Sequence, residues 1–276
     1  MNYLLFDIGG TNSRFAMSYD GISFSEPKIV DTPKDFDEAI ELFSGIAQEI
    51  SGGQIDRAGG GIAGALNSEK TGLFMSPNLP TWENKNFVES FSKKINSPVH
   101  IENDTAIVGL GEAVHGAGKT YNIVSYITIS TGVNGVKIID KKIDESTLGF
   151  EIGHQIIDFD NSMGIGSSGR GTLEDFISGR ETAKRFGVHP REIKDEKEWR
   201  KVAEWAAVGI YNTVLHWSPE VVVLGGSMMR DIPSDLIREK LHQMLSEVYP
   251  DSPEVLKAEL GSVGGIYGAL EYISHI

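Results

Sequence analysis

The stretch DIGGTNSR carries residue types that can hold an anion and a metal ion. Asp7 precedes Gly9 and Gly10, and Thr11 follows them. In a tight glycine turn, successive backbone N–H groups point the same way and form a nest for an anion. A carboxylate beside bound phosphates can orient the water shell of Mg²⁺, which gives Asp7 a function. A structural alternative stays open, because Asp is also common in hairpin turns.

A second glycine turn, in the stretch STGVNG, repeats this pattern farther along the chain. Thr131 and Gly132 lie between two apolar runs that each predict a strand. The segments LLFDIGGTNSRFAM and SYITISTGVNGVKII therefore share the order of strand, turn with threonine, and return strand. This internal echo suggests two related halves that face one another across a cleft.

The stretch IEND offers a candidate general base. Asp104 stands where a predicted strand ends and a predicted helix begins. Folds of the α/β class bind ligands at the carboxyl ends of their strands. A carboxylate there can accept the proton of an attacking hydroxyl, which contributes about 10²–10⁴-fold to a rate. The alternative is structural, since Asp is a favoured helix N-cap and Asn103 is a common turn residue.

Three further polar residues could bind hydroxyl groups. Glu151 and His154 lie three positions apart in GFEIGHQ, and Glu174 lies in GTLEDF. Two carboxylates and a histidine at one site would suit several neighbouring hydroxyls, as a sugar presents them. A histidine of this kind is more often a hydrogen-bonded structural group. A metal site that joins His154 to Asp158 and Asp160 is an alternative that the spacing supports poorly.

Alternating strands and helices must position these residues, and this alternation is typical of α/β sheets. Apolar periodicity and turn signals divide the chain into such elements. The predicted strands are 3–8, 14–19, 98–103, 122–130, 136–140 and 220–226, and residues 58–66 are predicted as a strand that runs into a glycine-rich loop. The predicted helices are 32–50, 86–95, 104–116, 173–186, 198–217, 235–248 and 261–273.

Residues 113–120, AVHGAGKT, fit a relaxed phosphate-loop pattern, but we reject that interpretation. The motif needs a strand before it and a helix after it, so that the helix N-terminus faces the phosphates. Here the predicted helix comes first and the strand NIVSYITIS follows. Gly116 and Gly118 are better explained as the end of a helix.

Composition and charge exclude several classes of function. The 276 residues carry a net charge of −14, which disfavours binding to nucleic acid and to anionic membranes. The chain has no cysteine, which excludes disulfides, thiolate catalysis and cysteine zinc sites. No apolar run approaches the ~18 residues of a membrane span, and no basic leader precedes the first strand. We therefore expect a cytoplasmic protein.

Taken together, these motifs resemble the ROK family of sugar kinases and repressors, in particular its glucokinase-like members. The resemblance covers nearly the whole chain. It depends on DIGGTNSR, GIAG with PNLPTW, ENDT with GLGE, STGVNG, GFEIGH, TLEDFISG and VVLGGSM, in family order. It implies an α/β, two-lobed, actin-like ATPase fold, a duplicated ribonuclease H-like arrangement with a central cleft. We expect a small lobe over 1–104, a larger lobe over 105–261, and a C-terminal helix, 262–276, packed back on the first lobe.

The resemblance also implies a role for each matched residue. Asp104 would be the catalytic base, and Asp7 would orient the Mg²⁺ shell. Ligands of the sugar would be Gly64, Asn78, Asn103, Asp104, Glu151, His154 and Glu174. The phosphates and adenosine of ATP would contact Asp7, Gly9, Gly10, Thr11, Thr131, Gly132, Gly225 and Gly226. The implied ligands are Mg²⁺ with ATP and a small sugar, and a homodimer is the default assembly.

The sequence departs from the family pattern at two places. Many members hold a structural zinc with a histidine and three cysteines, in a run CxCGxxGC. The corresponding stretch here is IGSSGRGT, with Ile165, Ser167 and Thr172 where sulfur is expected, so we expect no zinc. His154 would then serve the sugar alone. Asn134 replaces a glycine of the second turn, which is a minor change because asparagine tolerates left-handed geometry.

Alternatives remain for both the activity and the sugar. The repressors of the family carry a helix-turn-helix domain before the first glycine turn, and here Asp7 is six residues from the start. A non-catalytic sugar sensor is a further alternative, which Asp104 and the two turns argue against. Glucose is the first candidate substrate, and N-acetylmannosamine, N-acetylglucosamine, fructose and allose stay open, because single contacts separate such relatives.

Overall fold

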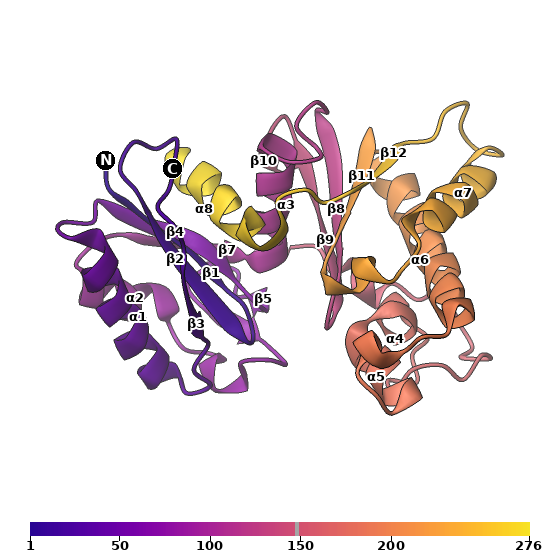
Figure 1. Ribbon diagram of the computed structural model, residues 1–276, viewed down its shortest axis with the longest axis horizontal. Coiled ribbons are helices and arrows are strands. Elements are labelled where there is room, and N and C mark those ends of the chain that lie inside the picture. Colours follow the sequence, from indigo (N-terminus) through magenta and orange to yellow (C-terminus); the bar gives the residue numbers. More distant parts are fainter. Residues whose placement is uncertain (147–148) are drawn as a thin grey trace. The chain divides into compact units, whose positions relative to one another are not determined.

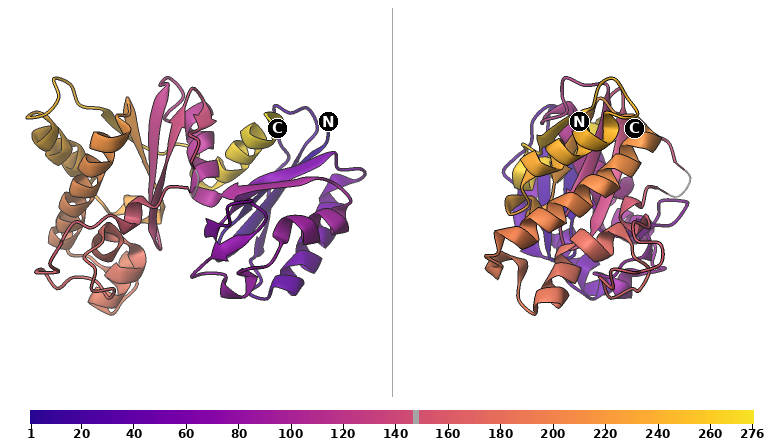
Figure 2. Two further views of the ribbon diagram at one scale, coloured as in Figure 1. Left: turned by 180° about the vertical axis from the view of Figure 1, so that it is seen from behind. Right: turned by 90° about the vertical axis from the view of Figure 1, so that its right-hand side faces the viewer.

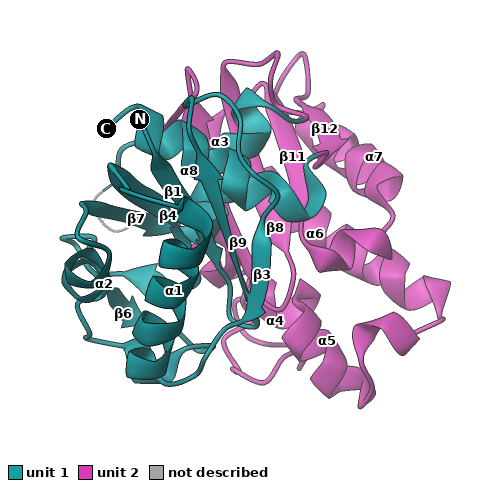
Figure 3. Cartoon of the chain, turned by 60° about the vertical axis from the view of Figure 1, so that its left-hand side comes forward, with its two compact units in different colours: residues 1–116, 145–149, 260–276 teal, residues 117–144, 150–259 magenta. Residues whose placement is uncertain are grey.

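The computed structural model describes residues 1–146 and 149–276. The chain forms two compact units, which Figure 3 distinguishes by colour. Unit 1 comprises residues 1–116, 145–149 and 260–276, and unit 2 comprises residues 117–144 and 150–259. Each unit has its own five-stranded sheet and its own apolar core.

The sheet of unit 1 has the order β3-β2-β1-β4-β7, and a small hairpin, β5-β6, follows β4. These strands are β1 (Tyr3–Ile8), β2 (Asn12–Ser18), β3 (Lys28–Asp31), β4 (Arg57–Ile62), β5 (Ala65–Leu66), β6 (Leu73–Met75) and β7 (Val99–Asn103). Strand β1 is antiparallel to β2, across the first glycine turn, and parallel to β4, which is parallel to β7. The carboxyl ends of β1, β4 and β7 therefore share one edge of the sheet.

Helices cover both faces of this sheet (Figures 1 and 2). The helices of unit 1 are α1 (Phe36–Ser51), α2 (Phe87–Ile95), α3 (Asp104–Val114) and α8 (Gly264–Ser274). Alternate residues of β1 explain the two layers. Leu4 and Phe6 share one buried cluster with the apolar faces of α1 and α2, whereas Tyr3 and Leu5 share another with α8.

Helix α1 begins later than predicted because Asp35 caps it. The Asp35 carboxylate accepts hydrogen bonds from the amides of Asp37 and Glu38, at 2.9 and 3.0 Å. Thr32 stays outside the helix, and its hydroxyl bonds the carbonyl of Gly9 at 2.8 Å. The predicted start at Thr32 is therefore wrong, and the residues before the cap support the first glycine turn instead.

The sheet of unit 2 has the order β10-β9-β8-β11-β12. Its strands are β8 (Ile123–Ile129), β9 (Val133–Ile139), β10 (Lys142–Ile143), β11 (Val221–Gly225) and β12 (Glu254–Lys257). Strand β8 is antiparallel to β9 and parallel to β11, which is parallel to β12. This order and these directions match those of β3-β2-β1-β4-β7, so the echo predicted from the sequence corresponds to a repeated sheet topology.

The helices of unit 2 are α4 (Leu173–Ile177), α5 (Gly179–Phe186), α6 (Glu196–Trp217) and α7 (Ser234–Leu245). Apolar residues of α4, α6 and α7 form one buried cluster with β8, β9, β11 and β12. The single helix predicted over 173–186 is two helices, because Ser178 ends α4 and caps α5 with its hydroxyl. Among the described residues, no helix has the length and apolarity needed to cross a bilayer.

Helix α3 belongs to unit 1, which corrects the lobe boundary predicted at residue 104. A Cβ atom at Gly268 of α8 would lie 1.7 Å from the carbonyl oxygen of Ile107, so the two helix backbones approach as closely as glycine allows. The Glu112 carboxylate accepts a hydrogen bond from the amide of Leu260 at 2.8 Å. Because α8 also packs on β1 and β4, it brings α3 into the same unit.

Candidate active site

Asp7 and Asp104 lie at the carboxyl edge of the first sheet. Asp7 is the penultimate residue of β1 and is opposite Gly61 in the parallel strand β4. Asp104 follows β7, and a Cβ atom at Gly61 would lie 2.8 Å from the Cα atom of Asp104. The absence of a side chain at Gly61 thus lets the backbone of Asp104 pack over the strand that separates it from Asp7.

The environment of Asp7 favours its protonated form. Burial is the main cause, the negative charge of Asp104 adds to it, and together they raise the pKa of Asp7 to about 6 despite the opposing effect of Arg14. The Arg14 Nη1 atom lies 3.5 Å from Oδ2 of Asp7. A Cβ atom at Gly265, in the first turn of α8, would lie 2.5 Å from the Asp7 carboxyl carbon. Glycine at that position therefore makes room for the carboxylate.

Asn103, rather than Asp104, is the N-cap of α3. Its side-chain oxygen accepts hydrogen bonds from the amides of Thr105 and Ala106, at 3.0 and 3.3 Å. Burial raises the pKa of Asp104, although hydrogen bonds from Thr105 partly oppose the shift. The alternative that Asp104 serves as the helix cap is therefore wrong. The Oδ2 atom of Asp104 accepts no hydrogen bond from the described residues.

In the first glycine turn, the backbone carbonyls accept hydrogen bonds from neighbouring residues, whereas two backbone amides are left without acceptors among the described residues. The carbonyl of Gly9 accepts from the Thr32 hydroxyl at 2.8 Å, and that of Gly10 accepts from Lys34 Nζ at 2.5 Å. The carbonyl of Thr11 accepts from the amide of Thr32 at 2.8 Å. Within the described part of the chain, the amides of Gly10 and Thr11 have no hydrogen-bond acceptor. Such a turn can receive an anion.

Two loop residues join this edge. A Cβ atom at Gly10 would lie 2.6 Å from Cβ of Asn78, so the Asn78 side chain packs directly on the turn. Gly64 has a φ of +136°, and its carbonyl accepts a hydrogen bond from the Asn103 side-chain amide at 3.0 Å. Unit 1 thus brings together every site residue predicted within it, and these are Asp7, Gly9, Gly10, Thr11, Gly64, Asn78, Asn103 and Asp104.

The second glycine turn repeats the arrangement of the first. The Ser130 amide donates to the Gly132 carbonyl at 2.8 Å, and the amides of Gly179 and Arg180 donate to the carbonyls of Ser130 and Thr131, at 2.7 and 3.1 Å. The amides of Thr131 and Gly132 have no acceptor among the residues that the structure describes. This turn, too, can receive an anion.

Gly225 and Gly226 lie beside this second turn. A Cβ atom at Gly226 would lie 2.3 Å from the Ile129 carbonyl oxygen, and Gly226 has a φ of +92°, so only glycine fits. The hydroxyls of Ser130 and Ser227 are 3.2 Å apart. The end of β11 and the start of η4 (Ser227–Arg230) therefore adjoin the turn.

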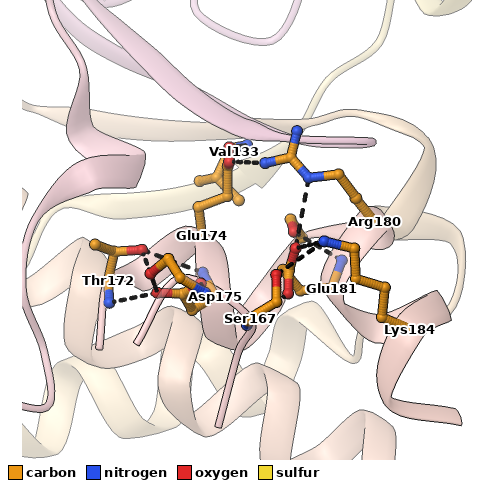
Figure 4. A network of polar contacts seen from close by, with 10 residues as sticks. Val133, Ser167, Thr172, Glu174, Asp175, Arg180, Glu181 and Lys184 are labelled. Carbon is orange, nitrogen blue, oxygen red and sulfur yellow. Dashed lines mark hydrogen bonds and ion pairs between the residues drawn. The ribbon is translucent and has the colours of Figure 1, made fainter. Parts of the chain in front are cut away.

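Glu174 connects the turn to the helices behind it (Figure 4). One carboxylate oxygen accepts a hydrogen bond from the Val133 amide at 2.9 Å, and the other pairs with the Arg180 guanidinium. A Cβ atom at Gly132 would lie 2.7 Å from Glu174 Oε2. The carboxylate therefore packs directly against Gly132, the residue before β9.

Glu151 precedes the short helix η2 (Ile152–His154) and His154 ends it, and this helix packs on β9. A Cβ atom at Gly153 would lie 2.1 Å from the Val133 carbonyl oxygen, so η2 approaches the same residue that Glu174 binds. Glu151 and His154 are exposed. All seven site residues predicted in unit 2 thus lie on segments that adjoin the second turn, and these are Thr131, Gly132, Glu151, His154, Glu174, Gly225 and Gly226.

The residues that replace a zinc site have other contacts. Ile165 packs against the apolar core, and Ser167 Oγ accepts from Lys184 Nζ at 2.8 Å. The Thr172 hydroxyl donates to Asp175 at 2.9 Å (Figure 4). These side chains offer no thiolate and are engaged elsewhere, so they do not fit a zinc ion.

The alternative metal site at His154 is not supported. The Asp158 carboxylate accepts from the amides of Ser162 and Met163, at 3.2 and 3.0 Å. In the described ranges, no group of three or more His, Asp or Glu side chains is arranged to hold a metal ion. The predicted order around residues 113–120 is confirmed, since α3 ends within this stretch and β8 follows it.

Sequence reasoning missed four residues that shape the site. Thr32 and Lys34 bind the carbonyls of the first turn, Arg14 pairs with Asp7, and Arg180 pairs with Glu174. For Arg14 a signal exists, because a hairpin around the glycine turn places it opposite Asp7. The other contacts depend on how loops and helices pack, which no local pattern in the sequence records.

Comparison with known proteins agrees with these observations. The sequence model of the ROK family matches residues 3–275. The N-acetyl-D-glucosamine kinase of Histophilus somni is 26% identical over 298 residues, covering 97% of this chain and 97% of that protein. The glucokinase of Streptomyces coelicolor is 25% identical over 305 residues, covering 96% and 95%.

A solved structure shares the fold along the full length. It is a ROK family glucokinase from Streptomyces griseus, in complex with glucose and AMPPNP. The two structures superpose with a TM-score of 0.81 over 99% of each chain, at 23% identity.

Proposed function

This chain belongs to the ROK family, and we propose that it is an ATP-dependent hexose kinase that phosphorylates the 6-hydroxyl of a sugar. It has the two-lobed, actin-like ATPase fold of that family. Sugar kinases with two specificities match nearly its whole length, a glucokinase and an N-acetyl-D-glucosamine kinase. Glucose is the first candidate substrate, and N-acetylated hexosamines and fructose are the alternatives.

The observation that carries the proposal is the combination of Asp104 with two open glycine turns. Burial raises the pKa of Asp104 toward the working pH, which makes its carboxylate a stronger base. The turns at Gly10–Thr11 and Thr131–Gly132 present amides without acceptors among the described residues. A base and two anion nests are the parts that transfer of a phosphoryl group to a hydroxyl requires.

In the proposed reaction, Asp104 accepts the proton of the sugar hydroxyl as its oxygen attacks the γ-phosphorus of ATP. The bond between that phosphorus and the bridging oxygen to the β-phosphate breaks, and ADP leaves with the electron pair. Asn103 holds the start of α3 in place through its cap, so the orientation of the base is fixed by the helix. Such transfers depend mainly on positioning and on stabilising charge.

Asp7 is suited to the metal that accompanies ATP. Its carboxylate is a hard oxygen donor, Arg14 Nη1 lies 3.5 Å from it, and it adjoins the first turn. Bound Mg²⁺ would neutralise phosphate charge during transfer. Asp7 would hold the hydration shell of the ion, and the amides of both turns would bind phosphate oxygens.

Each unit, taken by itself, supplies candidate ligands for the other hydroxyls of the sugar. In unit 1, Asn78 and the Gly64 loop adjoin Asn103, and the side-chain amide of Asn103 is already oriented by Gly64. In unit 2, Glu151 and His154 are exposed, and Glu174 is held by Val133 and Arg180. Several donors and acceptors in fixed positions would discriminate one hexose from another.

The test is ADP release from Mg·ATP across a panel of hexoses and N-acetylhexosamines, for wild type and Asp104→Asn. We expect turnover on one sugar, reduced at least ~10²-fold in the variant while sugar affinity by calorimetry stays within about threefold. Equal turnover by wild type and variant would mean that another group is the base. Sugar binding without turnover in the wild type would favour a non-catalytic sensor.

A further inference from the structure

We propose that Arg180 is a positioning residue that fixes Glu174 against the second glycine turn. Arg180 would thereby hold the Glu174 carboxylate in a constant position relative to the Thr131–Gly132 turn. This inference rests on the proposed function, in which Glu174 binds a sugar hydroxyl and the Thr131–Gly132 turn binds phosphate. Arg180 itself touches neither ligand in this account.

The side chain of Arg180 bridges two carboxylates. Its Nη2 atom donates to Oε1 of Glu174, and its Nε atom lies 3.5 Å from Oε1 of Glu181 (Figure 4). Glu181 is 5% exposed and Glu174 is 17% exposed, so a nearby cation offsets the cost of burying the two carboxylates. A planar guanidinium with several donors can satisfy both at once, which a lysine ammonium at the end of a flexible chain cannot do in the same geometry.

The backbone of Arg180 binds the turn directly. Its amide donates to the Thr131 carbonyl at 3.1 Å, and the preceding amide, of Gly179, donates to the Ser130 carbonyl at 2.7 Å. These two bonds draw the turn carbonyls toward the first residues of α5. The amides of Thr131 and Gly132 are then left for a ligand.

The side-chain and backbone contacts of Arg180 together link both sides of the second glycine turn. Glu174 accepts from Val133, directly after the turn, while Arg180 binds Thr131 within it and Glu174 beside it. Removing the guanidinium leaves the Glu174 carboxylate with one bond, from the Val133 amide, and with an uncompensated charge. We expect the carboxylate to reorient toward solvent, which would weaken the Val133 bond as well.

Arg180→Met is the test variant, because methionine keeps the apolar stem and removes the donors. Lys184→Met is the matched control. Lys184 lies on the same helix and pairs with Glu181 at 2.8 Å, but it has no contact with Glu174 among the described residues. Both variants lose one positive charge beside Glu181. Arg180→Met also loses the contact with Glu174, whereas Lys184→Met also loses the hydrogen bond to Ser167.

We expect Arg180→Met to raise the KM for the sugar at least tenfold, with kcat and the KM for ATP changed less, and Lys184→Met to change each within about twofold. Arg180→Lys should recover only part of the loss. The double variant Glu174→Gln with Arg180→Met should be no worse than Glu174→Gln alone, because residues that act together are non-additive. Additive losses, or equal losses in Arg180→Met and Lys184→Met, would overturn the proposal.

Hydrogen exchange at the Val133 amide gives a readout that does not depend on activity. Exchange there should be at least tenfold faster in Arg180→Met and unchanged in Lys184→Met, with melting temperatures confirming that both variants fold. If the wild type phosphorylates no sugar but this difference in exchange is found, the proposed function fails and the positioning role stands. If the wild type is active and the exchange is unchanged, the positioning role fails alone.

Discussion

Asp7 and Asp104 sit on either side of a glycine strand, close enough for the charge of Asp104 to raise the pKa of Asp7. The intervening residue, Gly61, has no side chain to screen the two carboxylates from each other. The like charges and the burial favour a proton on the pair at acid pH. The pKa values of Asp7 and Asp104 are therefore higher than those of an exposed pair of aspartates would be.

This pair predicts an acid limb in the pH profile. The free protein needs Asp7 and Asp104 ionised to hold a hydrated metal and to accept a proton, and the pKa of Asp7 is about 6. We expect kcat/KM for the sugar to fall as the pH drops through about 6. Arg14→Met should move this limb to higher pH, because Arg14 lowers the pKa of Asp7. A midpoint below pH 5, or no movement in the variant, would contradict this assignment.

Asp7→Asn should stabilise the fold while it impairs the reaction. The pKa of Asp7 in the folded protein is about 6, above the ordinary value of 3.8 for an aspartate. Stability therefore falls as the pH rises from about 4 to 6, and the loss is complete above 6. A shift of that size corresponds to a cost on the order of 2–3 kcal/mol at neutral pH, which asparagine would remove. Urea unfolding at pH 7.5 and at pH 4 checks this. The gain should appear at pH 7.5 and vanish at pH 4, and an equal gain at both would refute the charge argument.

Gly10→Ala tests the packing of the first turn against Asn78. The new Cβ would lie 2.6 Å from Cβ of Asn78, so the side chain or the turn must move. We expect kcat/KM to fall at least tenfold. The control is Gly45→Ala in α1, where a Cβ meets nothing within 4 Å. Alanine there should stabilise the helix by up to about 1 kcal/mol and leave kinetics unchanged. Similar kinetics for the two variants would mean that the contact with Asn78 is unimportant.

The sequence predicted the fold and the family well, because both depend on patterns that are local. The strand, glycine turn and return strand at residues 3–18 and again at 123–139 give two sheets of the same order, and the family match confirms the resemblance. The edge strands β3 and β12 were missed. Each has four residues, and so short a run has no clear alternation.

The candidate site residues could be proposed from the sequence, whereas the contacts that hold them in place could not. Glycine turns and the IEND motif are visible in the sequence because their chemistry lies within a few positions. Lys34 on the carbonyl of Gly10, and Arg180 on Glu174, come from packing of separate elements. The break at Ser178, which lets Arg180 begin a new helix beside the turn, is likewise invisible to apolar periodicity.

The loop over 156–172 predicts a protein without stoichiometric zinc. Ile165, Ser167 and Thr172 supply no thiolate, and their side chains pack in the core or bind Lys184 and Asp175. We expect elemental analysis of the purified protein to give well under one zinc per chain. Prolonged EDTA treatment, followed by dialysis into Mg²⁺, should leave the melting temperature unchanged. One zinc per chain, lost together with stability on chelation, would contradict the assignment.

Asp175 is the residue that we expect to order this loop instead. It is 3% exposed and accepts hydrogen bonds from the Thr172 amide and hydroxyl, at 3.0 and 2.9 Å, and from Ser168. Burial alone would raise the pKa of Asp175, but these hydrogen bonds outweigh it and hold the pKa below its usual value. The stabilising effect is therefore complete at neutral pH and is lost only as the pH falls below about 4.

Asp175→Asn should loosen the loop, because the amide nitrogen cannot accept the bonds that an ionised oxygen accepts. We expect a loss of about 1–3 kcal/mol at pH 7 and faster tryptic cleavage after the exposed residue Arg170. The sugar KM should rise as well, since Glu174 precedes Asp175 in the same short helix. Asp160→Asn is the control, because Asp160 lies in the same loop and interacts with Ser162 and Asp158 rather than with Ser168 or Thr172. Equal cleavage rates in the two variants would show that Asp175 does not hold the loop.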